Sequence, residues 1–141
     1  MPIRSADAEW TGGVPAGNGR VKLESGALDT QYNFSSRFES GTGTNPEELI
    51  AGAHAGCFSM AFSLMLGQEG FTPERVRTTA KVHIDKQGGG FAITRIDLVT
   101  RASIPGIGAD KFQEVAEKAK ANCPVSRALK AVDITLDAAL E

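Results

Sequence analysis

The sequence predicts an α+β fold in which antiparallel β-sheets surround one long central helix. An uncharged run from Leu49 to Gln68 has the length and apolar composition of a buried helix, and alternating polar and apolar segments flank it on both sides. The order of the segments is three strands, a helix, two strands, two helices and a strand, which favours antiparallel pairing. The length of 141 residues fits a single domain over residues 1–141.

The region before Thr44 predicts short strands separated by turns. The stretch AEWTG is a candidate strand, and TGGVPAGNG is a loop dense in glycine and proline. Val21 and Leu23 alternate with polar neighbours, as in a half-buried strand. Tyr32, Phe34 and Ser36 would share one face of a third strand.

The central helix carries start and stop signals. Asn45 suits the N-cap, Pro46 the first helical position, and Glu48 the third, where its side chain can reach back as in a capping box. Gly70 is a plausible stop, with Pro73 just beyond it.

The second half of the chain predicts a hairpin, two helices and a last strand. An apolar phase shift between Ile93 and Ile96 indicates a bulge or bend in the second strand of the hairpin. Pro124 disfavours helical geometry at Cys123, so that thiol should lie at a helix terminus. The predicted elements are strand 76–84, loop 85–90, strand 91–104, helix 110–122, a short helix over 124–130 and strand 132–138.

Composition excludes several classes of function. A net charge of -2 provides no basic surface for nucleic acid. The N-terminal residues MPIRSADAEW lack the apolar segment of a secretory signal, so we expect a cytoplasmic protein. Glycine, serine and His54 make the uncharged run too polar for a membrane span. Gly52 and Gly56 lie one helical turn apart, a spacing that hints at a homodimer.

His54 and Cys57 lie one turn apart in the central helix, and several kinds of chemistry must be weighed for them. A shared metal ion would need further ligands, but no CxxC or HExxH motif is present. A Cys-His hydrolase needs free backbone donors for an oxyanion, which a helix interior lacks. We therefore expect no metal, and favour a polar role for His54 inside a helix interface.

Redox chemistry is the remaining functional interpretation of Cys57 and Cys123. Cys57 lies far from the start of its helix and burial raises a thiol pKa, so a reactive Cys57 needs a cation beside it. Cys123 could then resolve a sulfenic acid into a disulfide. From the residues alone, two inert core thiols remain the simpler interpretation.

Three stretches resemble the OsmC/Ohr family of thiol peroxidases. NPEELIAGAHAGCFSMAFS resembles the cysteine helix of the family, ANCPVSRAL its second cysteine motif, and SSRFESGTGTNPEE the approach that carries an arginine. The resemblance covers the length and element order of the whole chain. The forms HAGC and CPVSRAL are closer to the OsmC branch than to Ohr.

The resemblance implies an OsmC-like fold and a peroxidase that reduces organic hydroperoxides, with hydrogen peroxide a poorer substrate. It implies that Cys57 is the peroxidatic thiol, Cys123 the resolving thiol, Arg37 the residue that holds the thiolate and polarises the peroxide, and Glu48 the residue that orients Arg37. It also implies an intertwined homodimer, no bound cofactor, and regeneration by an external dithiol such as a lipoyl group on a reductant protein.

Helix geometry adds a constraint on the implied site. Nine residues separate Glu48 from Cys57, which is a rise of about 13 Å with the side chains on nearly opposite faces. We therefore expect the Glu48 beside a given Cys57 to come from the partner chain, and leave open which chain supplies Arg37. Glu48 could instead serve only as a helix cap, and Arg127 is a rival cation. The alternative function is a non-enzymatic dimeric stress or ligand-binding protein with inert thiols.

Overall fold

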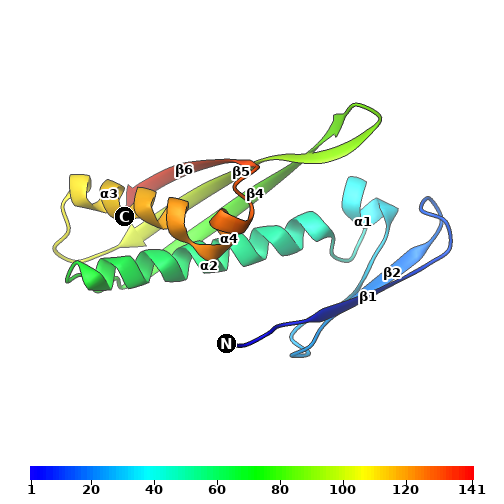
Figure 1. Cartoon of the computed structure of the whole chain (residues 1–141), viewed down its shortest axis with the longest axis horizontal. Helices are drawn as coiled ribbons and strands as arrows, with labels where there is room; N and C mark the ends of the chain where they lie inside the picture. Colours follow the sequence, from blue (N-terminus) through cyan, green and yellow to red (C-terminus); the bar gives the residue numbers. More distant parts are fainter. The chain divides into compact units, whose positions relative to one another are not determined.

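The computed structural model describes all 141 residues and divides into unit 1 (Met1–Leu49) and unit 2 (Ile50–Glu141), each described here by itself. The long helix α2 (Pro46–Gln68) begins in unit 1 and continues into unit 2. The α+β prediction is confirmed, whereas the single domain over 1–141 stays a prediction. The other elements, labelled in Figure 1, are β1 (Ala6–Thr11), β2 (Asn18–Leu23), β3 (Asp29–Tyr32), α1 (Phe34–Phe38), β4 (Arg75–Gln87), β5 (Gly90–Ser103), α3 (Ala109–Asn122), α4 (Pro124–Ala128) and β6 (Asp133–Leu140).

Unit 1 holds a three-stranded antiparallel sheet in the order β1-β2-β3. Gly19 of β2 pairs with Trp10 on one side and with Tyr32 on the other. The rings of Trp10 and Tyr32 approach to 5.4 Å between centroids across this glycine. A Cβ at Gly19 would lie 2.3 Å from the Tyr32 ring and 2.8 Å from the Trp10 ring, so the ring pair requires glycine at this position.

The predicted continuation of the third strand through Phe34 and Ser36 is wrong, because a short helix starts there. Asn33 is the N-cap of α1: its side chain accepts from the Ser36 N–H, and the Ser36 hydroxyl accepts from the Asn33 N–H, both at 2.9 Å. This reciprocal capping box satisfies two backbone donors and stops the strand at Tyr32. It also places Arg37 in the last turn of a helix.

The predicted start and stop of the central helix are confirmed. The Asn45 side chain accepts the Glu48 N–H at 2.7 Å, which caps the first turn. The Glu48 carboxylate accepts the Thr44 hydroxyl at 2.8 Å, so this side chain reaches back to a neighbour of the N-cap residue. Gly70 follows the helix with a φ of 89°, the left-handed conformation that glycine adopts without strain.

Unit 2 contains a sheet in the order β4-β5-β6. The β4–β5 hairpin is antiparallel and shifts register between His83 and Ile84, opposite Arg95 and Ile93, which confirms the predicted bulge. In contrast to the predicted antiparallel pairing, β6 runs parallel to β5. The chain crosses over through α3 and α4 before β6, and a crossover of this length permits parallel pairing. The tip of the hairpin projects beyond β6 (Figure 1).

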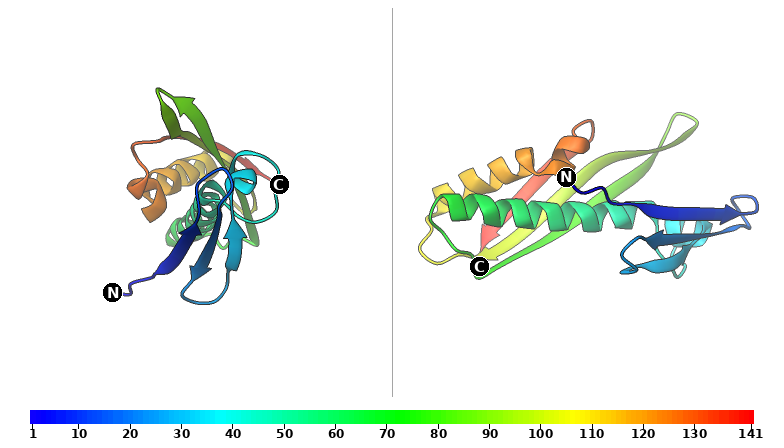
Figure 2. Two further views of the ribbon diagram at one scale, coloured as in Figure 1. Left: turned by 90° about the vertical axis from the view of Figure 1, so that its right-hand side faces the viewer. Right: turned by 60° about the horizontal axis from the view of Figure 1, so that its bottom comes forward.

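The apolar core lies between the sheet and the two longer helices of unit 2. Helices α2 and α3 lie side by side on one face of the sheet (Figure 2), and the Phe62 and Phe112 rings meet at 5.5 Å between centroids. Every buried hydrophobic residue of the chain belongs to unit 2, and unit 1 buries none. The core comprises Phe58, Phe62, Leu66, Ile96, Leu98, Ala102, Ile104, Phe112, Val115, Ala116, Ala119 and Cys123.

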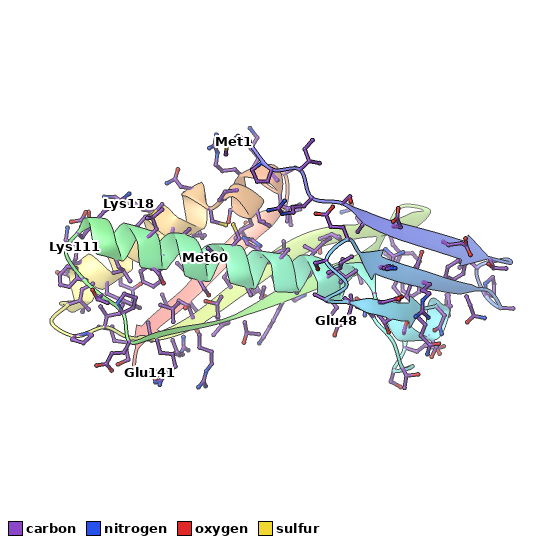
Figure 3. The ribbon with its side chains drawn as sticks, turned by 90° about the horizontal axis from the view of Figure 1, so that it is seen from below. Met1, Glu48, Met60, Lys111, Lys118 and Glu141 are labelled. Atoms are coloured by element: carbon purple, nitrogen blue, oxygen red, sulfur yellow. The ribbon has the colours of Figure 1, made fainter.

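The opposite side of α2 is exposed in the single chain. Met60, which points outward in Figure 3, is 77% exposed and Leu64 is 64% exposed. A Cβ added at Gly52 or Gly56 would meet no atom within 4 Å. By length and composition alone α2 could span a membrane, and its Phe58 and Phe62 pack in the core of unit 2.

Candidate active site

Unit 2 brings the two cysteines together from different elements. Cys57 lies in α2, while Cys123 is both the C-cap of α3 and the N-cap of α4. Its backbone is extended (φ −59°, ψ 137°), as expected for a residue before proline, so the prediction of a thiol at a helix terminus is confirmed. Both cysteines are free thiols; Cys57 is half-buried, whereas Cys123 is fully buried.

The environment of Cys57 disfavours its thiolate within the single chain. Burial raises the pKa of Cys57, the Val125 N–H lowers it by donating to Sγ at 3.5 Å, and hydrogen bonding and charge at Cys123 raise it again. The net pKa shift is upward, and no cationic side chain contributes to it. An activating cation is therefore what this arrangement lacks.

A buried polar chain extends from the second thiol. The Ser126 Oγ accepts from Cys123 Sγ at 3.2 Å, and the Ser126 N–H donates to the same sulfur at 3.3 Å. The Ser126 Oγ also lies 2.7 Å from His54 Nε2. Burial lowers the pKa of His54, which is 0% exposed, and its Nδ1 has no hydrogen-bond partner. Ser126 thus links a neutral imidazole to the Cys123 thiol.

Unit 1 positions Arg37 by a charge pair with Glu47. The Arg37 Nη2 donates to the Glu47 carboxylate at 2.7 Å, and Nε donates to both carboxylate oxygens at 3.2 Å. Glu47 is buried, whereas the Arg37 side chain is 37% exposed. Several charge-assisted bonds to one carboxylate restrict the rotamers of the guanidinium, which still presents donors to its surroundings.

Within unit 1, the glutamate that pairs with Arg37 differs from the one that the resemblance implies. Glu48 was expected to orient Arg37, but Glu47, one residue earlier, makes this contact. Successive helical residues point about 100° apart, so only one of the two glutamates can face α1. Glu48 is exposed and accepts the Thr44 hydroxyl instead. Its participation in the active site stays a prediction.

An aromatic cleft of about 160 Å³ adjoins Arg37 within unit 1. Its lining combines apolar side chains with the guanidinium, so the cleft suits a ligand that has an apolar body and a polar end. The lining residues are Trp10, Val14, Tyr32, Asn33, Phe34, Arg37 and Phe38.

The remaining candidates contact neither thiol. Arg127 is exposed and lines an open surface depression together with Lys130. His83, predicted as a solvated strand residue, is half-buried and pairs with Asp97 at 2.7 Å. No group of three or more His, Cys, Asp or Glu side chains has an arrangement that could hold a metal ion.

The structure therefore assembles two parts of the predicted site. Cys57 and Cys123 meet in unit 2, and Arg37 and Glu48 belong to unit 1. Sequence reasoning missed Glu47 and Ser126. The position of Ser126 three residues after an N-cap cysteine is the one local signal that could have indicated its contact with that sulfur.

Comparison with known proteins agrees with the resemblance. The family model described as OsmC-like protein matches residues 39–137, a range that includes Glu47, Cys57 and Cys123. The chain is 55% identical over 135 residues to the protein named Peroxiredoxin OsmC from Escherichia coli (strain K12), covering 95% of this chain and 94% of that protein. It is 33% identical over 138 residues to an organic hydroperoxide resistance protein of Xanthomonas axonopodis pv. citri, covering 95% and 93%.

Solved structures agree at the level of the fold. The crystal structure of the organic hydroperoxide resistance protein OhrB of Bacillus subtilis matches with a TM-score of 0.77 and 27% identity, covering 96% of this chain and 98% of that chain. The antiparallel and mixed sheets and the long helix described above are therefore the arrangement of this group of proteins.

Proposed function

Because the chain belongs to the family of OsmC-like proteins, we propose that it is a thiol peroxidase that reduces organic hydroperoxides, and hydrogen peroxide less well, in oxidative and osmotic stress defence. The observation that carries the proposal is the contact between Cys57 and Cys123 in the core of unit 2. Two thiols in contact can form a disulfide without rearranging the fold, whereas isolated core cysteines cannot.

The proposed cycle uses both thiols in turn. The Cys57 thiolate attacks the distal oxygen of the hydroperoxide, the O–O bond breaks, and the alkoxide leaves and is protonated to an alcohol. Cys57 becomes a sulfenic acid, which condenses with the Cys123 thiol to form a disulfide and water. An external dithiol then reduces the disulfide by exchange.

Arg37 is the proposed cation of the site. A guanidinium can stabilise both the thiolate and the negative charge that develops on the leaving oxygen. Its charge pair with Glu47 supports this role, because the pair restrains the guanidinium in advance of the reaction. The aromatic cleft beside Arg37 supports a preference for hydroperoxides with an apolar group. Glu48 remains a proposed fourth member of the site.

A homodimer is part of the proposal. Unit 1 buries no hydrophobic residue of its own, and α2 leaves Met60 and Leu64 exposed. Both features favour a second copy of the chain that covers them, since a sheet without a core is marginal in water. In this dimer, each pair of Cys57 and Cys123 would meet the Arg37 and the glutamates of the partner.

Mixed dimers test which chain supplies Arg37. A chain with Arg37→Ala is co-expressed with a differently tagged chain carrying Cys57→Ser, and the mixed dimer is purified through both tags. If the arginine crosses between chains, one intact site forms and about half of the wild-type activity returns. Activity as low as that of either homodimeric variant would refute the exchange.

The proposal also covers the cofactor, the reductant and the cellular compartment. Thiol chemistry of this kind needs no prosthetic group, and the reductant is proposed to be a dithiol, such as a lipoyl group carried by another protein. A reducing compartment keeps both cysteines as thiols between turnovers, which suits the cytoplasm.

One observation favours the second candidate, a non-enzymatic protein with inert thiols: burial raises the pKa of Cys57 in the single chain. Intact-mass measurement with thiol counting separates the two, before and after one equivalent of an organic hydroperoxide. The peroxidase loses both thiols and two hydrogens per chain, and Cys57→Ser abolishes the reaction. With one equivalent Cys123→Ser stops at the sulfenic acid, which further hydroperoxide overoxidises. Survival of both thiols would overturn the peroxidase proposal.

A further inference from the structure

The polar chain from Cys123 through Ser126 to His54 has no role in the cycle described above. All three residues are buried; Cys123 and Ser126 lie at the start of α4, whereas His54 comes from α2, far away in the sequence. The buried Nδ1 of His54 has no hydrogen-bond partner, which costs free energy in a core that otherwise pairs its polar atoms. A polar chain retained at such a cost calls for a reason other than stability.

We propose that Ser126 and His54 carry the proton of the resolving thiol away from Cys123 when this thiol attacks the Cys57 sulfenic acid. Ser126 contacts the reacting sulfur, and His54 receives the proton through the Ser126 hydroxyl. The inference rests on the proposed peroxidase function and assigns residues to its second step.

The hydrogen-bond directions support this role. The Ser126 Oγ accepts from Cys123 Sγ at 3.2 Å, so its single hydrogen is free for His54 Nε2 at 2.7 Å. This direction corresponds to the His54 tautomer that carries its hydrogen on Nδ1 and leaves Nε2 as the acceptor. The Ser126 N–H, 3.3 Å from the same sulfur, donates to the thiolate as it forms. In this tautomer, the hydrogens of Cys123 and Ser126 point in the direction of transfer.

Burial explains why the reaction would need such a path. Cys123 is 0% exposed, so water does not reach its sulfur in this structure to take the proton. The sulfur attacks as a thiolate, and the proton must therefore leave through the protein. Ser126 is the one hydrogen-bonding side chain other than Cys57 that contacts Cys123.

The step balances as follows. The S–S bond forms between Cys123 and Cys57 while the S–O bond of the sulfenic acid breaks; the Cys123 sulfur is oxidised and the Cys57 sulfur is reduced. The thiol proton moves to Ser126 Oγ, and the hydroxyl proton moves to His54 Nε2. The leaving hydroxide takes a proton from solvent, and the imidazolium later releases one, so the net products are one disulfide and one water.

The surroundings of His54 keep its imidazole unprotonated before the step. Burial is the sole cause that lowers the pKa of His54, so the imidazole stays neutral to lower pH than an exposed histidine. The titratable groups linked to it are the two thiols, and α2 carries no charged residue within unit 2. Arg127, the charged residue of α4, is exposed. The charged pairs of α3 involve partly or fully exposed side chains: Lys111–Glu69, Lys111–Glu114, Lys118–Glu114 and Lys120–Glu117.

The test follows the two steps separately in the full-length protein. One equivalent of an organic hydroperoxide is added in a rapid-mixing experiment; sulfenic acid is trapped chemically and disulfide is counted by mass. Ser126→Ala should leave oxidation of Cys57 unchanged and slow disulfide formation about 100-fold. Ser126→Thr restores the hydroxyl and should restore the rate. Ser59→Ala is the matched control, because Ser59 bonds Thr78 and contacts neither thiol.

The dependence of the rate of disulfide formation on pH distinguishes proton transfer from a structural role. It can be measured first in the wild type, without any substitution. In the wild type, disulfide formation should change little between about pH 6 and about pH 8, since His54 remains the acceptor. In Ser126→Ala and His54→Gln, solvent hydroxide must take the proton, so the rate should rise about 10-fold per pH unit.

Three results for the rate of disulfide formation would overturn the inference. The wild-type rate could rise about 10-fold per pH unit, or the Ser126→Ala rate could lie within about threefold of the wild-type rate. The third result is a Ser126→Thr variant that forms the disulfide as slowly as Ser126→Ala. If the wild type forms no disulfide at all, the proposed function itself fails. If the wild type completes the cycle and Ser126→Ala forms the disulfide equally fast, the proton path is refuted while the proposed function stands.

Discussion

Replacing Glu47 by glutamine should impair Arg37 more than any change at the neighbouring glutamate. The Glu47 carboxylate is buried and receives three contacts of 2.7–3.2 Å from the guanidinium. Glutamine keeps the shape but loses the charge, and its amide N–H groups face the donors of Arg37. The guanidinium then loses its counter-charge and its fixed direction.

The cost to stability can be estimated from exposure. Removing one partner of a fully buried pair costs about 3–5 kcal/mol, but the Arg37 side chain is 37% exposed and solvent compensates part of the loss. A hydrogen bond to a charged group contributes about 1.5–3 kcal/mol, and partial solvent compensation brings the expected loss to about 1–2 kcal/mol, which is about 3–6 °C in melting temperature. Because a guanidinium that is present but mobile still screens some charge, oxidation of Cys57 should slow about 10- to 100-fold.

Glu48→Gln is the matched control for this prediction. Glu48 is exposed and bonds only the Thr44 hydroxyl, so its replacement should change stability by less than about 0.5 kcal/mol. The assay is rapid-mixing oxidation of Cys57 by an organic hydroperoxide, with thermal unfolding of each variant. A slow Glu48→Gln beside a normal Glu47→Gln would refute the assignment and return the orienting role to Glu48.

Three further predictions concern acid stability, the core and the dimer. Hydrogen bonds from Thr135, His83 and Arg95 lower the pKa of Asp97 to about 2. This carboxylate therefore stabilises the fold above its unfolded pKa of about 4, and the stabilisation is lost as the pH falls toward 2. Asp97→Asn should be less stable than the wild type at neutral pH, and the difference in urea midpoint should vanish near pH 2. A difference that persists unchanged at pH 2 would contradict the charge explanation. Phe62→Ala should cost about 3–5 kcal/mol in urea unfolding, because the ring is 0% exposed and packs on Phe112; a cost below about 1 kcal/mol would mean that the site collapses to fill the cavity. Met60→Lys should weaken the proposed dimer in sedimentation experiments, and an unchanged dissociation constant would place the interface elsewhere.

Local chemistry determined most of the secondary structure. Asn45 and Pro46 mark the start of α2 and Gly70 its end, because caps act on backbone groups within about one turn. The phase shift in β5 predicts the bulge, since side chains alternate strictly along a strand. The same locality explains the failure at Phe34: the alternation predicted a strand, but the Asn33 and Ser36 cap is a stronger local signal for a helix.

Tertiary structure decided the features that depend on distant residues. Whether β6 runs parallel to β5 depends on where the crossover through α3 and α4 delivers the chain. The sequence does not distinguish Glu47 from Glu48 as the partner of Arg37. Within unit 1, the direction of the first turn of α2 relative to α1 brings Glu47 into contact with Arg37. His54 and Ser126 are separated by 72 residues, and the packing of α2 against α4 brings them within 2.7 Å. The sequence thus predicted candidate residues for the chemistry, whereas packing decided which of them meet, because hydrogen bonds and charge pairs require contact in space.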